Sequence, residues 1–175
     1  IATLAARYVA AVGDHAVRVV DTRKTTPGLR AVERHAVRCG GGHNHRYSLS
    51  DAVMIKDNHL AVMGDVTAAL RAAAADLPHT THIEVEVDRL DQIDAVLDAG
   101  VVDTIMLDNF SPDDLRTGVK QIDGRALVEA SGGVNLETIG EIAATGVDVI
   151  SVGALTHGVV ALDLGLDIVV TRTGG

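Results

Sequence analysis

Short apolar runs, rich in β-branched residues, recur along the chain, and polar residues or glycines separate them. Six of these runs have the length of buried strands: Val17–Asp21, Ala52–Lys56, Ile83–Asp88, Val102–Asp108, Ala126–Ala130 and Val147–Val152. Amphipathic segments lie between several of the runs. Because strands that alternate with helices over short connections form parallel sheets with right-handed crossovers, the pattern predicts an α/β fold.

Residues that start and stop helices support this pattern. Thr26 and Pro27 offer an N-cap and an N1 proline for a helix that Gly40 ends. Ser111 and Pro112 repeat that arrangement, and two aspartates follow in the first turn, where the helix dipole favours negative charge. Two further helices are expected, one from residue 90 to a stop at Gly100 and one opening at 135–137 and ending at Gly146.

Polar residues stand at or just after the C-terminal end of every predicted strand. They are Asp21, Lys56, Glu86, Asp88, Asp108, Glu129, Ser131 and Gly153. An open doubly wound sheet would instead show a glycine-rich loop after its first strand. A (β/α) barrel collects such groups at one mouth. We therefore expect a TIM-like barrel of parallel strands in one domain over residues 1–175, irregular or incomplete because only six strands are predicted.

The alternation of the third strand places Glu84, Glu86 and Asp88 on one face, opposite three aliphatic residues. In a barrel the aliphatic face meets the helices, so these acids are expected to point toward the barrel axis, as are Asp108 and Lys56. Carboxylates crowded inside a protein require cations or hydrogen-bond donors nearby. The alternative, that acids at strand ends only begin turns or cap helices, stays open.

Two glycine-rich regions indicate ligand contacts. In the first, three glycines at 40–42 allow close backbone approach, and His45 and Arg46 follow with charged donors. A transition-metal site at the two histidines of this loop is an alternative, as is a purely structural loop. In the second, Ser131-Gly132-Gly133 and the loop opening at Gly153 follow the last two strands, where barrels commonly bind phosphate.

Charge is unevenly distributed in this acidic chain, whose net charge is −9. Residues 21–60 hold seven of the 15 Lys and Arg residues but only four of the 24 acids. A single basic region favours a small anionic ligand and argues against nucleic acid, which needs an extended basic surface. The simplest interpretation of the arginines in the predicted helix is a solvated face; they are Arg30, Arg34 and Arg38.

Composition narrows the remaining classes of protein. Aromatic residues make up only 2%, which argues against base stacking, and no apolar run reaches the length of a membrane span. The first residues resemble no signal peptide. A single cysteine, Cys39, fits a reducing compartment, so we expect a cytoplasmic protein.

Several motifs, in order along essentially the whole chain, resemble quinolinate phosphoribosyltransferase, the carboxylating nicotinate-nucleotide pyrophosphorylase family. They lie at 21–30 (DTRKTTPGLR), 40–46 (GGGHNHR), 49–51 (LSD), 55–59 (IKDNH), 84–87 (EVEV), 106–110 (MLDNF), 129–133 (EASGG) and 151–157 (SVGALTH). The family forms nicotinate mononucleotide, pyrophosphate and CO₂ from quinolinate and phosphoribosyl pyrophosphate in NAD synthesis. The resemblance implies this activity, with Mg²⁺ as cofactor.

The resemblance also implies residue roles. Quinolinate would be bound by Arg23, His45, Arg46 and Lys56. Phosphoribosyl pyrophosphate would be bound by Thr22, Lys24, Lys56, Glu86, Asp108, Ser131, Gly132, Gly133, Val152, Gly153, Ala154 and His157. Lys24, Glu86 and Asp108 would act in catalysis, and Glu86 and Asp108 would bind Mg²⁺ directly or through pyrophosphate.

Members of this family carry an N-terminal α/β sandwich domain and take an arginine from a partner subunit. The resemblance therefore predicts that both lie outside this chain, and that the full-length protein is a homodimer or a larger homo-oligomer. Two alternatives remain. One is a paralogous barrel, such as the related proteins associated with molybdenum transport, acting on another anionic base. The other is a non-catalytic barrel fragment that binds phosphate.

Overall fold

The structure, a computed structural model that describes residues 1–169, contains one sheet of six parallel strands. The strands are β1 Arg18–Val20, β2 Val53–Ile55, β3 Ile83–Val87, β4 Thr104–Asp108, β5 Leu127–Ser131 and β6 Val149–Ser151. Each strand lies within the predicted run or extends one residue beyond it. The predicted α/β fold is confirmed.

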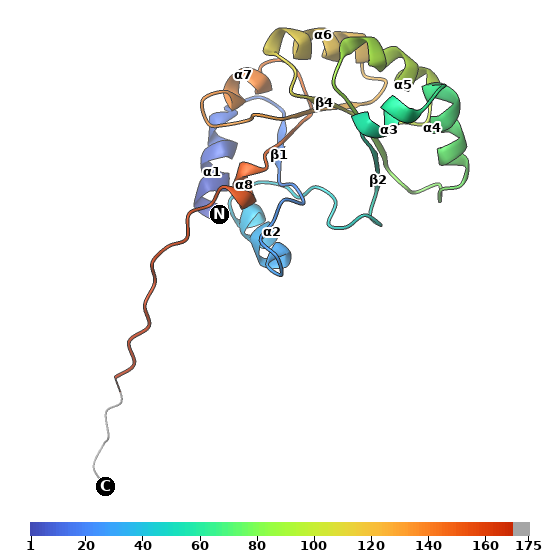
Figure 1. Cartoon of the computed structure of the whole chain (residues 1–175). Coiled ribbons are helices and arrows are strands. Elements are labelled where there is room, and N and C mark those ends of the chain that lie inside the picture. The colour runs from blue at the N-terminus through green and yellow to red at the C-terminus, as the bar shows by residue number, and fades with distance from the viewer. Residues whose placement is uncertain (170–175) are drawn as a thin grey trace.

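The strands follow the order β1-β6-β5-β4-β3-β2, and the sheet curls so that its two edges turn toward each other (Figure 1). No ladder joins β1 to β2 within residues 1–169. Instead, the chain after α2 (Arg30–Cys39) adds one parallel bridge to the β1 edge, between Val20 and His43. The fold is therefore the incomplete barrel that the strand count predicted, with its opening between β1 and β2.

Helices surround the outer face of the curved sheet (Figure 1). Besides α2 they are α1 Ala2–Ala11, α3 Asp57–Val62, α4 Val66–Ala75, α5 Ile93–Ala99, α6 Pro112–Ile122, α7 Ile139–Ala143 and α8 Ala154–His157, and a 3₁₀ turn at Leu90–Gln92 precedes α5. The sequence analysis did not predict α1, α3, α4 or α8. None of the helices in the described part of the chain is long and apolar enough to cross a membrane.

Two predicted helix ends are confirmed in detail. Ser111 caps α6, and its hydroxyl accepts a hydrogen bond from the Asp114 amide at 3.2 Å. Gly100 ends α5 in the left-handed region, at φ 68°, which glycine adopts without the steric cost that a Cβ brings.

Two predicted helix starts were wrong. Helix α2 begins at Arg30 because residues 26–29 form a turn, in which the Leu29 amide donates to the Thr26 carbonyl at 3.0 Å. Helix α7 begins at Ile139, since the Asn135 carboxamide oxygen accepts from the amides of residues 137 and 138 and holds that segment in a turn. Both Thr26 and Asn135 make local turns instead of helix caps.

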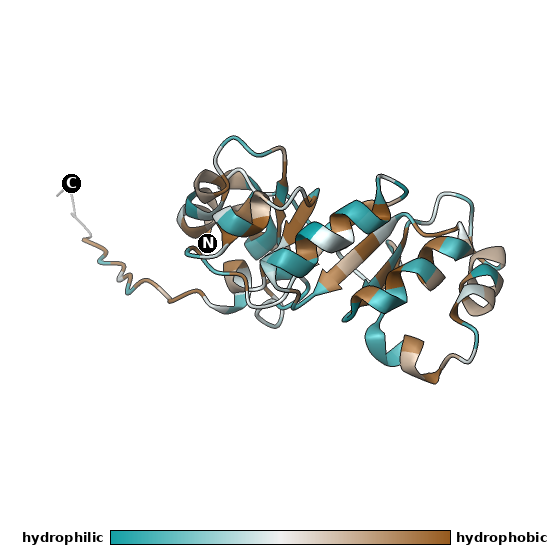
Figure 2. Ribbon diagram, turned by 90° about the horizontal axis from the view of Figure 1, so that it is seen from above, coloured by the Kyte–Doolittle hydropathy of each residue, from teal (hydrophilic) through white to brown (hydrophobic). Residues whose placement is uncertain are grey.

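The apolar core fills the space between the sheet and the helices. Val85, Ile105 and Ile150 are fully buried on the outward face of the strands, and α5 and α6 pack Ile93 and Ile122 against that face. Figure 2 shows the strands as mainly hydrophobic and the helices as mixed. Alternation along each strand then turns the polar residues inward, so the barrel interior is lined by charged side chains.

Gly40, at the end of α2, allows α1 and α2 to approach closely. A Cβ on Gly40 would lie 2.4 Å from the Ala2 carbonyl oxygen and 2.7 Å from the Ala5 Cβ. Because the φ of Gly40 is −82°, the constraint is steric and involves no backbone strain. The two helices cover the β1 side of the barrel and so support the strand from which the site begins.

We expect Gly40→Ala to lower the free energy of unfolding by about 1–3 kcal/mol, since α1 must move to admit the methyl group. The matched control is Gly64→Ala, because a Cβ at Gly64 meets no atom within 4 Å. The control should change stability by less than about 0.5 kcal/mol. Urea denaturation of both variants tests this, and equal effects would contradict the close-contact explanation.

Candidate functional site

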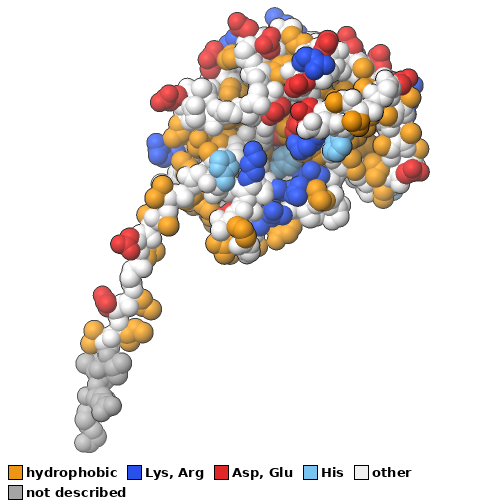
Figure 3. Space-filling view, viewed as in Figure 1, with side chains coloured by type: hydrophobic (Ala, Val, Ile, Leu, Met, Phe, Trp, Pro, Cys, Tyr) orange, Lys and Arg blue, Asp and Glu red, His pale blue; other side chains and the backbone are white. Residues whose placement is uncertain are grey.

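The C-terminal ends of the strands surround a cavity of about 370 Å³, here called the mouth cavity. It is lined by Thr22, Arg23, Lys24, His45, Arg46, Met54, Lys56, Glu86, Met106, Asp108, Glu129, Ser131 and Ser151. Strands β2 to β6 contribute to it, and β1 does so through the loop that follows it. Figure 3 shows basic and histidine side chains gathered at the centre of this face. The prediction that polar strand ends meet at one mouth is confirmed for Lys56, Glu86, Asp108, Glu129 and Ser131.

One side of the mouth cavity is acidic. Lys56 at the end of β2 forms an ion pair with Glu86 of β3, whose carboxylate is 7% exposed. Asp108, the last residue of β4, accepts a hydrogen bond from the Asn109 side chain at 2.7 Å. Asp88, which the alternation turned inward, is exposed and pairs with Arg89, so this inward prediction was wrong and the turn alternative holds.

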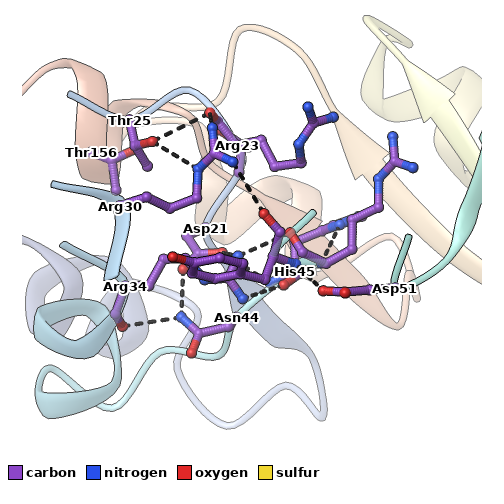
Figure 4. Close-up of polar contacts among 12 residues, drawn as sticks. Asp21, Arg23, Thr25, Arg30, Arg34, Asn44, His45, Asp51 and Thr156 are labelled. Carbon is purple, nitrogen blue, oxygen red and sulfur yellow. Dashed lines mark hydrogen bonds and ion pairs between the residues drawn. The ribbon is translucent and has the colours of Figure 1, made fainter. Parts of the chain in front are cut away.

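The opposite side of the mouth cavity depends on a buried carboxylate. Asp21 follows β1 and is completely buried. Its carboxylate accepts hydrogen bonds from Arg34 Nη1 at 3.2 Å, from the His45 amide at 2.9 Å and from the Asn44 side chain (Figure 4). Burial raises the pKa of Asp21, and these donors act against that effect. Asp21 therefore attaches the loop that carries His45 to the end of β1.

Arg34 of α2 continues this network. Its guanidinium donates to the Arg46 carbonyl at 3.0 Å and to the His45 carbonyl, and it lies 5.3 Å from the centre of the Tyr47 ring. Arg34 is only 8% exposed. A buried arginine with these partners determines the path of the loop at 44–47 (Figure 4).

The predicted solvated face of α2 is thus wrong for two of its three arginines. Arg34 is buried, and Arg30 donates to Thr25 Oγ1 and to the Arg23 and Tyr47 carbonyls at 3.0–3.2 Å. Only Arg38 is exposed, as expected, and it donates to Gly42. Sequence spacing does not reveal this difference, because the acceptors of Arg30 and Arg34 come from loops before and after the helix.

Two arginines face the mouth cavity with incompletely used donors. Arg46 donates one guanidinium hydrogen bond to the Ala52 carbonyl at 2.9 Å. Burial and the nearby positive charge of Arg23 lower its pKa, although it stays protonated in ordinary conditions. The Arg23 Nε atom is buried and has no hydrogen-bond partner in the described chain. Two neighbouring guanidinium groups with spare donors favour an anionic ligand.

His45 connects the basic side to the barrel interior. Its Nε2 atom lies 3.2 Å from a Glu84 carboxylate oxygen and 3.5 Å from a Glu129 carboxylate oxygen. Both acids are 3% exposed. Burial alone would lower the pKa of His45, but the hydrogen bonds and charges of Glu129 and Glu84 outweigh burial and raise it to about 10. Burial also raises the pKa of Glu129. We call these three side chains the His45 cluster.

The His45 cluster offers one nitrogen and two oxygen atoms within 4.8 Å of one another, a spacing that a metal ion could accept. The imidazole is already engaged, however, because Nε2 faces both carboxylates and Nδ1 accepts the Arg46 amide at 2.8 Å. The cluster is therefore better described as an ion-paired proton site. The transition-metal alternative for the loop gains no support, since His43 lies outside this set.

Loops after β5 and β6 border the mouth cavity near Lys24. The amides of Gly132, Gly133 and Gly153 donate to no protein group in residues 1–169. Gly132 has φ 90°, and a Cβ there would lie 2.2 Å from the Asn109 side-chain oxygen. The Thr156 hydroxyl donates to the Lys24 carbonyl at 2.6 Å and joins the β6 loop to the β1 loop. Free amides at neighbouring strand ends suit a phosphate group.

The structure brings most of the predicted site residues together. Those that line the mouth cavity are Thr22, Arg23, Lys24, His45, Arg46, Lys56, Glu86, Asp108 and Ser131. Gly132, Gly133 and Gly153 lie in the two loops beside it, and Ala154 and His157 belong to α8, which follows Gly153; a Cβ on Gly153 would be 3.0 Å from His157 Nε2. Val152 is apart, since its side chain is fully buried and its amide donates to the Val20 carbonyl.

Several residues of the site were missed. Glu129 and Ser151 line the mouth cavity, and Glu84 completes the His45 cluster. The alternation along β3 did place Glu84 inward, and Glu129 was recognised as a polar strand end. What the sequence lacks is any indication that both acids contact His45, which lies far from them along the chain.

Comparisons with known proteins identify the family. The sequence model described as "Quinolinate phosphoribosyl transferase, C-terminal domain" matches residues 1–167. The nicotinate-nucleotide pyrophosphorylase [carboxylating] of Mycobacterium leprae is 50% identical over 171 residues, which cover 96% of this chain and 60% of that protein. A relative from Bacillus subtilis is 43% identical, covering 98% of this chain and 59% of its own length. The chain thus spans about 60% of the length of the curated relatives that it matches.

Solved structures give the same result. The crystal structure of NadC from Streptococcus pyogenes has a TM-score of 0.85 at 46% identity, covering 90% of this chain and 55% of that one. The nicotinate-nucleotide pyrophosphorylase from Francisella tularensis has a TM-score of 0.83 at 42% identity, covering 89% and 55%. The incomplete barrel is therefore a shared architecture.

We expect Asp21→Asn to lower the free energy of unfolding by about 3–5 kcal/mol, because it leaves the buried Arg34 without its counter-ion. Asp113→Asn is the control, since Asp113 forms an exposed ion pair with Arg116 at 2.8 Å and should contribute less than about 1 kcal/mol. Urea denaturation measures both. Similar losses in the two variants would contradict the central role of the Asp21–Arg34 pair.

The raised pKa values of the His45 cluster predict how stability depends on pH. A group whose pKa is higher in the folded state than its ordinary 6.5 stabilises the fold below that value and loses this contribution as the pH rises through about 10. The unsubstituted protein should therefore lose more stability between pH 7 and 10 than Glu129→Gln, which removes one charge that holds the proton. Parallel curves of unfolding free energy against pH would contradict this prediction.

Proposed function

Because the chain belongs to the quinolinate phosphoribosyl transferase family, we propose that the protein containing it transfers a phosphoribosyl group from phosphoribosyl pyrophosphate to quinolinate, with decarboxylation. The products are nicotinate mononucleotide, pyrophosphate and CO₂. One observation carries the proposal: a single cavity at the barrel mouth has partly unpartnered guanidinium groups on one side and carboxylates on the other. A pyridine dicarboxylate and a phosphorylated sugar require these two environments side by side.

Quinolinate belongs on the basic side of the mouth cavity. Arg23 and Arg46 present positive charge there, and their spare guanidinium donors match a carboxylate in planar, bidentate geometry. Lys56 adds positive charge from the acidic side, where it pairs with Glu86. The Asp21–Arg34 network holds the backbone of Arg46, so this group is oriented before a ligand arrives. Orientation of this kind lowers the entropy cost of binding.

The ribosyl and pyrophosphate groups belong on the acidic side. Glu86 and Asp108 line the cavity there, and Lys24 lies next to the loops after β5 and β6. The free amides of Gly132, Gly133 and Gly153, with Ser131 and His157 beside them, are our proposed site for the 5′-phosphate. This arrangement puts the reacting carbon of the sugar between the phosphate loops and the quinolinate site.

The carboxylates of Glu86 and Asp108 also fit Mg²⁺, which prefers oxygen ligands and is commonly bound through one or two carboxylates plus substrate phosphates. We propose that these two residues hold the ion, directly or through pyrophosphate. Bound there, Mg²⁺ would neutralise charge on the departing pyrophosphate.

The chemistry follows from these positions. When pyrophosphate leaves, positive charge develops on the anomeric carbon, and Glu86 and Asp108 stabilise it electrostatically. Lys24 faces the leaving group. The quinolinate nitrogen forms the new bond to the sugar, and the resulting cationic ring accepts the electron pair that CO₂ leaves behind. Positioning supplies most of the catalysis in this proposal.

A partner copy and a cytoplasmic location complete the proposal. Both come from the family resemblance and from the single cysteine, not from contacts within this chain. In the proposal, an arginine from the N-terminal domain of a second subunit adds to the basic side of the mouth cavity.

We expect Arg46→Ala in the full-length protein to weaken binding of quinolinate, or of its analogue phthalate, by about 2–5 kcal/mol, because a carboxylate loses its buried partner. Binding of phosphoribosyl pyrophosphate should change far less. Asp108→Asn is the matched comparison and should lower turnover while leaving phthalate binding nearly intact. Calorimetry with each ligand and an assay of nicotinate mononucleotide test the proposal; equal losses for both ligands in Arg46→Ala, or binding of phosphate ligands without phthalate, would overturn the assignment.

A further inference from the structure

The His45 cluster lies between two cavities. Beyond the mouth cavity, a second space of about 530 Å³ opens toward the N-terminal ends of the strands, where Arg18, His82 and Leu127 line it. His45, Arg46 and Glu129 line both spaces. The cluster is therefore in contact with both cavities.

The contacts within the cluster leave some of its hydrogen-bond acceptors unused. One carboxylate oxygen of Glu84 and one of Glu129 are buried and have no hydrogen-bond partner within residues 1–169. A buried carboxylate oxygen without a donor is costly unless it holds a proton or receives one. The Ser151 hydroxyl, also buried and unpartnered, lines the mouth cavity with Glu129.

Other charged groups face the cluster from both cavities. On the mouth side they are Arg23, Arg46 and Lys56; the arginines retain their protons at any ordinary pH, and Lys56 is paired with Glu86. On the lower side they are Arg18, His43 and His82, which open to the second cavity. Of the three residues that line both cavities, His45 and Glu129 are those that can exchange a proton, because the third, Arg46, retains its protons.

Protons are held in the cluster at neutral pH. The pKa of His45 is raised to about 10 by Glu129 and Glu84 against the effect of burial, and burial raises the pKa of Glu129. The Nε2 atom of His45 faces both carboxylates, so the proton that the cluster shares is the one on Nε2. We assign the extra proton to His45 and Glu129 together, because strongly coupled groups titrate as a unit.

We propose that His45 and Glu129 form a buried proton store that delivers its proton into the mouth cavity, to the ring carbon from which CO₂ departs. This inference rests on the proposed function. Decarboxylation breaks the bond between that ring carbon and the carboxylate, and the electron pair stays on the carbon next to the cationic nitrogen. A proton from the store then forms the new C–H bond, and water from the second cavity returns a proton to the store.

The proposal gives a reason why Glu84 and Glu129 are buried beside His45: the last step of the reaction needs a proton. Without a prompt proton, the carbanion recombines with CO₂, and the net reaction slows even when phosphoribosyl transfer is unaffected. The store lines both cavities, so it can act while the substrate fills the mouth cavity.

The test is a single-turnover experiment on the full-length protein with saturating phosphoribosyl pyrophosphate and carboxyl-labelled quinolinate, following pyrophosphate and CO₂ separately. We expect Glu129→Gln to release pyrophosphate within threefold of the normal rate but to release CO₂ at least tenfold more slowly, so that a nucleotide with both carboxylates accumulates. The D₂O effect on CO₂ release should also increase. Asp88→Asn, an exposed acid just beyond β3, is the control and should change neither rate more than twofold.

Three outcomes decide the matter. Equal slowing of both products, or normal release of both, in folded Glu129→Gln would overturn the proton store and leave the proposed function intact. Failure of the unsubstituted protein to release pyrophosphate would overturn the proposed function and this inference with it. If circular dichroism shows that Glu129→Gln does not fold, Glu129→Asp takes its place, because it keeps the carboxyl group but withdraws it from His45, and the same separation of the two rates is expected.

Discussion

The buried ion pair between Asp21 and Arg34 is the constraint on which the rest of the site depends. Asp21 ends the first strand, Arg34 belongs to the helix that follows, and both hold the backbone of the loop at 44–46. Removing two charges from water is unfavourable unless each finds several partners. Here the partners are loop groups, so the charges become stable only when His45 and Arg46 take the positions that face the mouth.

In the barrel interior, too, buried charges are paired with opposite charges. Aliphatic side chains fill the outer face of the strands, and the inward face carries Glu84, Glu86 and Glu129, each less than a tenth exposed. Lys56 neutralises one of these acids and His45 lies between the other two. Internal acids thus hold the cationic side chains of the site, and the remaining hydrogen-bond donors of these side chains point into one cavity. The ion pairing that offsets the burial of these acids also keeps a proton in the His45 cluster, at the centre of the interior.

The gap in the sheet between β1 and β2 makes the two sides of the site structurally different. The loops of the basic side cross this opening, where only one bridge joins Val20 to His43, while the acidic side and the phosphate loops stand on the continuous part of the sheet. In the proposed function, a dicarboxylate would therefore meet loops fixed by side-chain ion pairs, and the sugar phosphate would meet loops that follow strands joined by backbone ladders. Relatives are about two-thirds longer than the matched region, consistent with the proposed contribution of further residues to the basic side.

Local pattern determined much of this protein. Six apolar runs gave all six strands, Ser111 and Gly100 gave a helix start and a helix end, and alternation along β3 turned Glu84 and Glu86 inward. Strand ends in a parallel sheet share one edge, so the sequence also predicted which polar residues meet. These inferences succeed because they depend on neighbours within a few residues.

Only the tertiary structure determined which side chains pair with one another. Arg30 and Arg34 have the spacing of a solvated helix face, yet loops from both sides of the helix cover them. Thr26 and Asn135 look like helix caps, yet turns take up their hydrogen bonds. Glu129 contacts His45 only after three intervening strands and their helices have closed the sheet around the axis. Burial and pairing depend on contacts between segments that are distant in the sequence. The neighbours of a charged residue in the sequence therefore do not indicate whether such a contact forms.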